Sequence, residues 1–157
     1  MKKIYLAGDC SSENRTLMVQ VATVLRENDF DVYCPWELKV ENAWGIPQEE
    51  WAQKVFEADI AAINNCDIFF MISYGRNSTA GTNWENGYAF ALNKKIVIFQ
   101  ITDMPTSLMT FSSASNFFNC SRENLIEKVK YAIRCIEINI NGTMYQDNNI
   151  NCKTVLT

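Results

Sequence analysis

Histidine is absent from this sequence of 157 residues. The absence excludes a Ser-His-Asp triad, a Cys-His dyad and any zinc site that depends on imidazole ligands. If the chain is an enzyme, carboxylates, tyrosines or a bound cofactor must carry its proton transfer and its nucleophilic chemistry.

Long apolar runs are also missing, and no segment approaches the ~20 residues that a membrane-spanning helix needs. The N-terminal stretch "MKKIYLAGDCSS" begins with basic residues, but its apolar run is too short for a signal peptide and ends at Asp9. We therefore expect a cytoplasmic protein that does not associate with membranes.

A cluster of positive charge is absent. The formal net charge is −4, and the lysine and arginine residues are not concentrated in any segment. A protein that binds the phosphate backbone of DNA or RNA needs such a cluster, so a nucleic-acid polymer is not an expected partner. Small anionic ligands remain compatible with this composition, because backbone amides can bind them.

The cysteines form no C-x-x-C pair, and no metal-ligating cluster is recognisable, so we expect no metal. In a cytoplasmic protein such scattered cysteines are expected to be reduced thiols. Cys10, in an expected loop, is the one candidate for a reactive thiol. The six cysteines are at positions 10, 34, 66, 120, 135 and 152.

The sequence does contain a regular alternation of strand-like and helix-like segments. It predicts an α/β fold with a doubly wound, Rossmann or flavodoxin-like parallel sheet of five strands. We expect the strand order 2-1-3-4-5. Strands are expected at 2–8, 31–35, 66–73, 95–101 and 115–119, and helices from Ser11 or Ser12 to Asn28, at 48–65, at 82–93 and from Ser121 onward.

The length suits a single domain. We expect a catalytic domain over residues 1–138 and a C-terminal tail over 139–157 that is frayed or contacts a neighbouring subunit. In the expected strand order, the loops at 8–14 and 74–81 meet where the winding reverses, and ligands bind at that edge of such sheets.

Glu85 stands in a segment that is poorly suited to form a helix. In one interpretation, "TNWE" (82–85) is a capping box with Thr82 at the N-cap and Glu85 reaching back to it. In the other, Glu85 is functional, because Asn83, Asn86 and Gly87 weaken the helix around it and leave the backbone open to a ligand.

Asp59 is a second carboxylate in an unusual place. On a helical wheel it falls in the middle of the apolar arc formed by Ala52, Val55, Phe56 and Ile63. We expect this arc to face the core, so a carboxylate there must be paired, hydrogen-bonded or protonated. It is either a buried residue that caps a backbone amide or an acid with a tuned pKa beside a cleft. Two carboxylates at one cleft suit the cleavage of a glycosidic bond.

The four tryptophans have two expected locations, and some of them are expected to stack on the base of a ligand. Trp36 and Trp44, in the loop after the second strand, are candidates for a lid. Trp51 and Trp84 are expected in the core or at a subunit interface.

Several segments, in consistent order over residues 2–120, resemble the nucleoside 2-deoxyribosyltransferase family. The most specific is the pattern G-T-x-W-E-x-G-Y-A within "GTNWENGYAFALNKKIVIF" (81–99). The supporting segments are "KIYLAG" (3–8), "FEADIAAINNCDIFF" (56–70) and "SLMTF" (107–111). The resemblance implies a Rossmann-like subunit, no cofactor, and a dimer-based homo-oligomer whose subunits share active sites.

By this resemblance, Glu85 is the nucleophile that attacks C1′ of a 2′-deoxynucleoside and forms a deoxyribosyl-enzyme ester. A second nucleobase then takes the sugar with retention of configuration. Asp59 matches the acid that helps to protonate the departing base, and Tyr5 matches the tyrosine that orients the nucleophile. Substrate contacts are expected at Gly8, Asp9, Thr79, Gly81, Ser107 and Met109, the last two contributed to a neighbour's site.

Two departures from the family pattern put the natural substrate in question. Thr79 stands where nucleoside transferases carry an Asp that holds the 5′-hydroxyl, and Ser107 stands where many carry Asn. Small hydroxyl residues at these places are typical of a related branch, the deoxynucleoside 5′-monophosphate N-glycosidases, because an Asp would repel a phosphate. Hydrolysis of such a monophosphate is therefore the alternative function. An NAD glycohydrolase and a non-catalytic nucleotide sensor also remain open.

Overall fold

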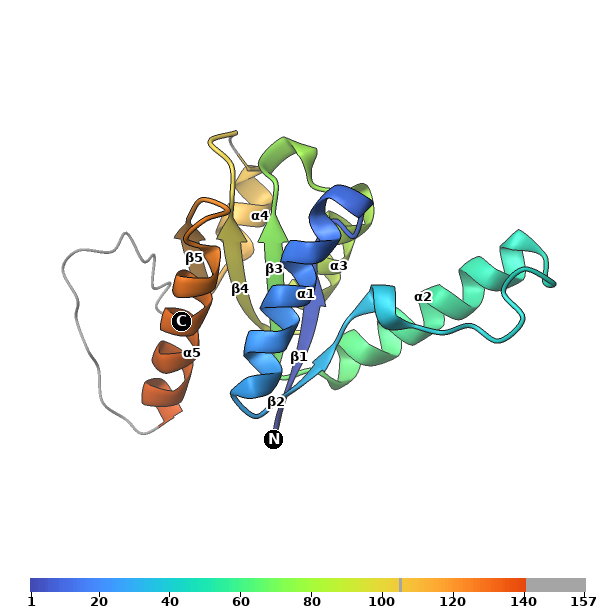
Figure 1. Cartoon of the computed structure of the whole chain (residues 1–157), viewed down its shortest axis with the longest axis horizontal. Coiled ribbons are helices and arrows are strands. Elements are labelled where there is room, and N and C mark those ends of the chain that lie inside the picture. Colours follow the sequence, from blue (N-terminus) through green and yellow to red (C-terminus); the bar gives the residue numbers. More distant parts are fainter. Residues whose placement is uncertain (105, 141–157) are drawn as a thin grey trace.

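The computed structural model describes residues 1–104 and 106–140. Five parallel strands form one sheet in the order β2-β1-β3-β4-β5, which confirms the predicted fold class and strand order (Figure 1). The chain winds outward in both directions from β1, which pairs with both β2 and β3. The strands are β1 (Lys2–Ala7), β2 (Phe30–Tyr33), β3 (Ile68–Ser73), β4 (Lys95–Gln100) and β5 (Asn116–Asn119).

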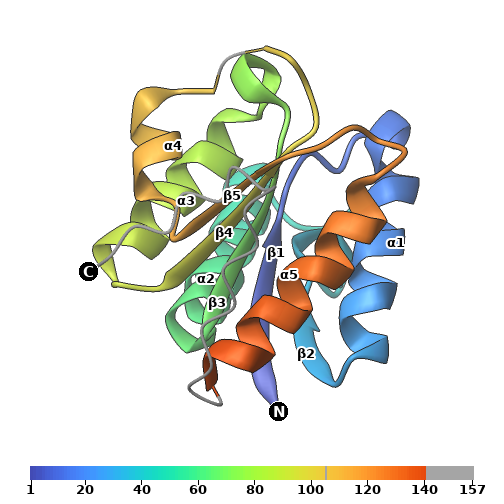
Figure 2. The ribbon, with the colours of Figure 1, turned by 90° about the vertical axis from the view of Figure 1, so that its left-hand side faces the viewer.

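Helices cover both faces of the sheet (Figure 2). On one face lie α1 (Ser12–Glu27) and α5 (Leu125–Ile140), and on the other lie α2 (Gln48–Asn65), α3 (Ala80–Ala91) and α4 (Leu108–Ser113). Because helices cover both sides, every residue of the central strand β3 is buried.

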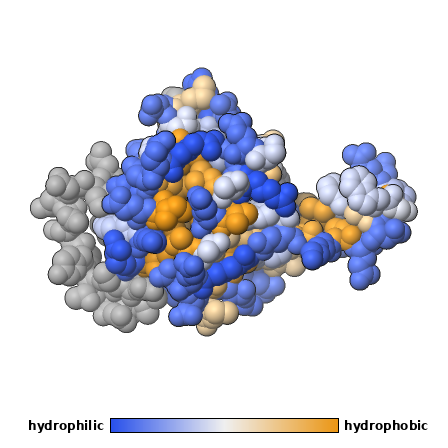
Figure 3. Space-filling view, viewed as in Figure 1, coloured by the Kyte–Doolittle hydropathy of each residue, from blue (hydrophilic) through white to orange (hydrophobic). Residues whose placement is uncertain are grey.

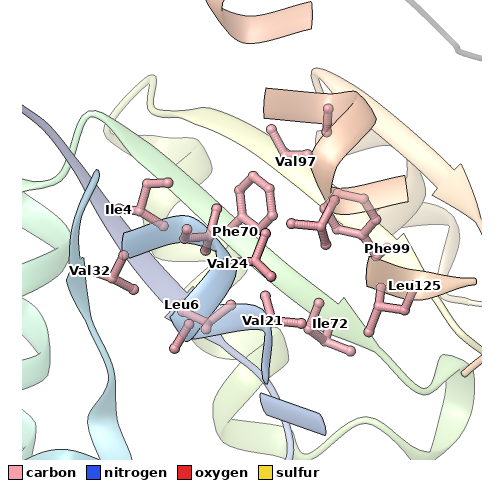
Figure 4. Close-up of a cluster of buried hydrophobic side chains, with 14 of the residues drawn as sticks. Ile4, Leu6, Val21, Val24, Val32, Phe70, Ile72, Val97, Phe99 and Leu125 are labelled. Atoms are coloured by element: carbon pink, nitrogen blue, oxygen red, sulfur yellow. The ribbon is translucent and has the colours of Figure 1, made fainter. Parts of the chain in front are cut away.

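The larger apolar core lies between the sheet and the α1/α5 layer (Figure 4). There Leu6, Phe70 and Phe99 of the sheet pack with Val21 of α1 and Leu125 of α5. This layer anchors the sheet, and the opposite face carries the two carboxylates that the sequence singles out.

The start of α3 differs from the prediction. Its N-cap is Thr79, whose Oγ1 accepts a hydrogen bond of 3.2 Å from the backbone N–H of Thr82. The predicted capping box with Thr82 at the N-cap is therefore wrong. Glu85 lies in the second turn of α3, past the unpaired N–H groups that a capping side chain satisfies.

Three smaller differences concern other helix ends. The segment that forms α4 was not predicted to be helical. α5 begins at Leu125 after a turn, rather than directly after Ser121. Ser11 is the N-cap of α1, but its hydroxyl donates to the carboxylate of Asp9 and does not accept from a backbone N–H of the helix.

Helix α2 projects away from the body of the molecule (Figure 1). Of its residues, all of which the structure describes, Ile63 alone is buried. Trp51 and Phe56 are 42% and 50% exposed. The apolar arc of this helix was expected to face the core, but it does so only at the C-terminal end. Its outer part forms open apolar surface (Figure 3).

The predicted tail begins inside α5, which extends to Ile140, and residues 141–157, including Cys152, lie outside the described residues. Within residues 1–104 and 106–140, no helix is both long enough and apolar enough to cross a membrane. The cysteines of these ranges are free thiols, at positions 10, 34, 66, 120 and 135.

Candidate active site

Glu85 is a half-buried residue of α3 that reaches toward β1. Its Oε1 accepts a hydrogen bond of 2.9 Å from the hydroxyl of Tyr5, a fully buried residue of β1. Burial raises the pKa of Glu85 to about 7; the Tyr5 hydrogen bond opposes this rise, and the negative charge of Asp59 adds to it. Because Tyr5 binds Oε1, the carboxylate is oriented and Oε2 is available to a ligand.

Asp59, on α2, is held in a similar way by a second tyrosine. The hydroxyl of Tyr33, the last residue of β2, donates a hydrogen bond of 2.8 Å to Oδ1 of Asp59. Burial raises the pKa of Asp59, and the Tyr33 hydrogen bond opposes the rise. The partner is therefore a tyrosine hydroxyl and not the backbone amide of the structural interpretation.

The two carboxylates share a cavity of about 350 Å³ between α2 and α3. Such a cavity can hold a flat heteroaromatic ring against apolar walls while two acids act on the bond that joins the ring to a sugar. Within the described part of the chain, no group of three or more Cys, Asp or Glu residues is placed to hold a metal ion. The remaining lining residues are Trp51, Ala52, Val55, Phe56, Ile60, Ile63, Gly81 and Trp84.

Gly81 lies one helical turn before Glu85 on the same side of α3. A Cβ atom built at this position would have no neighbouring atom within 4 Å. Gly81 also does not have a positive φ, unlike Gly75. Neither packing within the subunit nor backbone conformation requires glycine here, so the open space beside Glu85 is available to a ligand.

Gly8 and Asp9 lie in the loop after β1. A Cβ atom at Gly8 would lie 2.6 Å from Cε of Met18, so the end of this α1 side chain would have to shift if Gly8 were replaced. The carboxylate of Asp9 accepts hydrogen bonds from the backbone N–H and hydroxyl of Ser11 and from the side-chain amide of Asn14. These bonds, the backbone one most strongly, lower the pKa of Asp9, so this loop carries a negative charge.

Three other predicted substrate contacts do not line the cavity of Glu85. The Thr79 hydroxyl caps α3. Ser107 caps α4 through a hydrogen bond of 3.2 Å from the N–H of Met109, whose side chain is 81% exposed. Ser107 lines a separate, more polar cavity of about 450 Å³ together with Arg76 and Thr106. Within one subunit, the structure does not bring these residues to the two carboxylates.

Cys10 was the candidate for a reactive thiol. Its Sγ donates a hydrogen bond of 3.4 Å to the carbonyl oxygen of Gly8. Burial, and then the negative charges of Asp9 and Glu85, raise the pKa of the Cys10 thiol to about 11. The thiol therefore stays protonated at neutral pH, which argues against a nucleophilic role.

Tyr33 was not among the predicted site residues, and Trp36 does not lie where it was predicted. The signal for Tyr33 was available, because it ends the strand expected beside that of Tyr5. For Trp51 and Trp84 the core location is excluded, since both are partly exposed and line the cavity, and the subunit-interface location stays a prediction. Trp36 packs against the core beneath α1, whereas Trp44 is fully exposed.

The chain is similar to known proteins in sequence and in fold. The sequence model of the family described as nucleoside 2-deoxyribosyltransferase matches residues 4–150. A solved 2-deoxyribosyltransferase from the psychrotolerant bacterium Bacillus psychrosaccharolyticus is similar, with 29% identity and a TM-score of 0.66 over 79% of this chain and 90% of that one.

Two more distant structures share the fold. A CMP N-glycosidase of Clostridium botulinum has 19% identity and a TM-score of 0.62, over 83% of this chain and 99% of that one. A conserved protein from Enterococcus faecalis V583 has 21% identity and a TM-score of 0.62, over 84% and 99%. No curated protein matches the chain significantly.

Proposed function

Since the chain belongs to the nucleoside 2-deoxyribosyltransferase family and is thus an enzyme that acts on N-glycosidic bonds, we propose that it transfers 2-deoxyribose from a 2′-deoxynucleoside to another nucleobase. Such an activity suits nucleoside salvage in the cytoplasm. The observation that carries the proposal is the pair of tyrosine-held carboxylates, Glu85 and Asp59, in one apolar cavity.

The first chemical step uses Oε2 of Glu85 as the nucleophile. This oxygen attacks C1′, the electrons of the C1′–N bond pass to the departing base, and Asp59 supplies the proton that the base takes up. The product is a deoxyribosyl-Glu85 ester. The raised pKa of Asp59 suits a proton donor. The Tyr5 hydrogen bond favours the ionised, nucleophilic form of Glu85, but burial outweighs it and raises the pKa of Glu85 to about 7.

In the second step, a nitrogen of the incoming base attacks C1′ and Asp59 accepts its proton. Glu85 then departs as a carboxylate. Each step inverts C1′, so the product retains the configuration of the substrate. Both bases are proposed to lie against the apolar walls, with Trp84 and Phe56 close to the carboxylates.

We propose a homo-oligomer in which a neighbour supplies Ser107 and Met109. Leu108 and Met109 are 83% and 81% exposed and lie outside their own subunit's catalytic cavity. The apolar surface of α2 is similarly uncovered, as expected for a surface that a second copy covers.

The alternative function is hydrolysis of a deoxynucleoside 5′-monophosphate to the free base and the sugar phosphate. Thr79 supports it, since a hydroxyl in place of a carboxylate does not repel a phosphate. The ionised Asp9 in the loop after β1 opposes it, because a phosphate near that loop would meet a like charge. We therefore place transfer first.

The deciding experiment incubates the protein with deoxyinosine and adenine, and separately with each deoxynucleoside 5′-monophosphate and with NAD. Chromatography follows the products. Deoxyadenosine that forms only when adenine is present supports transfer. Free base released from a monophosphate alone supports the alternative, and release of nicotinamide from NAD would contradict both.

Replacing Gly81 with alanine is expected to change stability and activity in opposite directions. A helical alanine stabilises α3 by up to about 1 kcal/mol. Its methyl group occupies the open space beside Glu85 and displaces the sugar, which lowers kcat/KM by about tenfold or more. Urea unfolding and initial transfer rates measure the two effects.

The matched control is Gly87→Ala, which lies on nearly the opposite side of the same helix from Glu85 and where a Cβ atom also has no neighbour within 4 Å. It should give a similar gain in stability with little loss of activity. If both variants keep full activity, the sugar does not approach α3 at Gly81.

A further inference from the structure

Three aromatic rings lie side by side across β2, β1 and β3. Tyr5 is paired in register with Tyr33 on one side and with Phe69 on the other. The Tyr5 and Tyr33 ring centroids are 5.4 Å apart with an interplanar angle of 22°, and the Tyr5 and Phe69 centroids are 5.5 Å apart with an angle of 9°. The parallel pairing of strands thus fixes both the spacing and the tilt of the two tyrosine rings.

The two tyrosines bind carboxylates from different helices. Tyr5 donates to Glu85 on α3, and Tyr33 donates to Asp59 on α2. Helix α2 makes little contact with the rest of the subunit along its outer part, so its own packing does not position Asp59 tightly. The hydrogen bond to Tyr33 ties Asp59 to the rigid sheet, beside the residue that holds the other carboxylate.

We propose that Tyr33 is a positioning residue for glycosidic cleavage, which sets the distance of Asp59 from Glu85 and directs the proton of Asp59 to Oδ2. This inference rests on the proposed function and assigns a task to a residue that the family resemblance did not bring into the site.

The spacing of the rings fits this task. Glycosidases that retain configuration hold their two carboxyl groups about 5–5.5 Å apart, because the nucleophile and the acid act on adjacent atoms. From the ring centroids, 5.4 Å apart with an interplanar angle of 22°, we infer a similar separation of the two hydroxyls. Each hydroxyl binds one carboxylate, so the spacing of the paired strands sets the separation of Asp59 and Glu85.

The donor at Oδ1 also decides where the acidic proton lies. A carboxyl oxygen that accepts a hydrogen bond from Tyr33 is best suited to be the carbonyl oxygen of the neutral acid. The proton of Asp59 then resides on Oδ2, the oxygen left free to face the ligand. Without the Tyr33 hydroxyl, the acid can rotate and carry its proton on either oxygen.

The titratable groups around this contact come from three parts of the chain. Asp59 on α2 and Glu85 on α3 both act on Tyr33, as does the neighbouring thiol of Cys34. Burial raises the pKa of Asp59, and the Tyr33 hydrogen bond lowers it. Removal of the hydroxyl takes away a donor that favours ionised Asp59, so the pKa of Asp59 should rise further in its absence.

The test is Tyr33→Phe, which keeps the stacked ring and removes the hydroxyl. Its matched control is Tyr88→Phe. This variant removes a hydroxyl of α3 that donates a hydrogen bond of 3.1 Å to Asn64 of α2, the two helices that carry the carboxylates. Each variant is assayed with deoxyinosine, whose base must be protonated to leave, and with 4-nitrophenyl 2-deoxyriboside, whose leaving group departs as an anion.

We expect Tyr33→Phe to lower kcat for deoxyinosine by about 10- to 100-fold, as expected for a lost hydrogen bond to a charged group, with a smaller change in KM. With the nitrophenyl substrate the loss should be much smaller. The basic limb of the pH–rate profile should move to higher pH, because Asp59 keeps its proton longer. The ¹³C signal of the Asp59 carboxyl, assigned with Asp59→Asn, should titrate at higher pH in the same variant.

Equal losses on both substrates, with an unmoved basic limb, would overturn the role of Tyr33 and leave the proposed function intact. So would a Tyr33→Phe enzyme that behaves like Tyr88→Phe. A wild-type enzyme that cleaves neither substrate would overturn the proposed function, and with it this positioning role, whatever the ¹³C titration shows.

Discussion

Replacing Glu85 with glutamine is expected to reduce turnover by at least about 10³-fold, because the amide cannot form the deoxyribosyl ester. Glutamine has nearly the same shape and can still accept the hydrogen bond from Tyr5, so the cavity should be preserved. Chromatography of the transfer products measures the loss. Mass spectrometry of acid-quenched wild-type enzyme with a deoxynucleoside, but without an acceptor base, should reveal one deoxyribosyl group on the peptide that contains Glu85.

The control is Glu57→Gln, the same substitution at an exposed residue of α2 that accepts a hydrogen bond from Gln53. It should leave the rate within about twofold, since surface substitutions away from a site have small effects. If Glu85→Gln kept a tenth or more of the wild-type rate, Glu85 would not be the nucleophile. A nucleotide sensor, by contrast, would bind in both forms and show no turnover in either.

The Glu85→Gln substitution should stabilise the protein at alkaline pH. Burial raises the pKa of Glu85 from 4.5 to about 7, so the folded state binds this proton more tightly than the unfolded state does. The contribution of Glu85 to stability is therefore fully present below pH 4.5 and is lost as the pH rises through 7. At pH 8, glutamine should raise the free energy of unfolding by an amount on the order of 3 kcal/mol. Urea unfolding at pH 5 and pH 8 should show the gain mainly at pH 8.

Replacing Asp59 with asparagine is expected to lower the transfer rate by about 10²–10⁴-fold, the usual contribution of a general acid. Asparagine can accept the Tyr33 hydrogen bond but cannot give a proton to the departing base. Both half-reactions should slow, because Asp59 donates a proton in the first and accepts one in the second. Single-turnover release of hypoxanthine from deoxyinosine isolates the first.

The leaving group separates this role from a loss of structure. With 4-nitrophenyl 2-deoxyriboside the first step needs no proton, so Asp59→Asn should form the ester almost as fast as the wild type. Asp31→Asn, at an exposed position of β2, is the matched control and should be active on both substrates. An equal loss on both substrates would remove Asp59 from the role of acid and leave it as a structural residue.

The prediction of the sheet from the sequence succeeded because its signals are local. Segments such as "IFFMIS" in β3 are apolar throughout, as a strand covered on both faces must be, and they alternate with amphipathic helices. Glu85 and Asp59 were recognisable because each violates a local rule. Glu85 occupies a helix weakened by Asn and Gly, and Asp59 interrupts an apolar arc.

The details that failed depend on contacts between distant residues. Thr79 and Thr82 are both good N-caps three residues apart, and the sequence does not distinguish between them. In the folded chain the helix begins at Ala80. With this start, the Glu85 carboxylate makes no capping hydrogen bond and instead accepts the hydrogen bond from Tyr5. The apolar arc of α2 was expected in the core. The expectation failed because apolar spacing shows that a surface will be covered but does not show what covers it.

By itself, then, the sequence determined the parallel sheet and its strand order, and it singled out Glu85 and Asp59 as candidate acids in a chain without histidine. The family resemblance already pointed to Tyr5, 80 positions from Glu85, but only the tertiary structure decided that Tyr33 holds Asp59, 26 positions away. Such pairs form when strand pairing places two tyrosine rings side by side and helix packing brings one carboxylate within hydrogen-bond distance of each hydroxyl. No local pattern of residues encodes a distance between two helices.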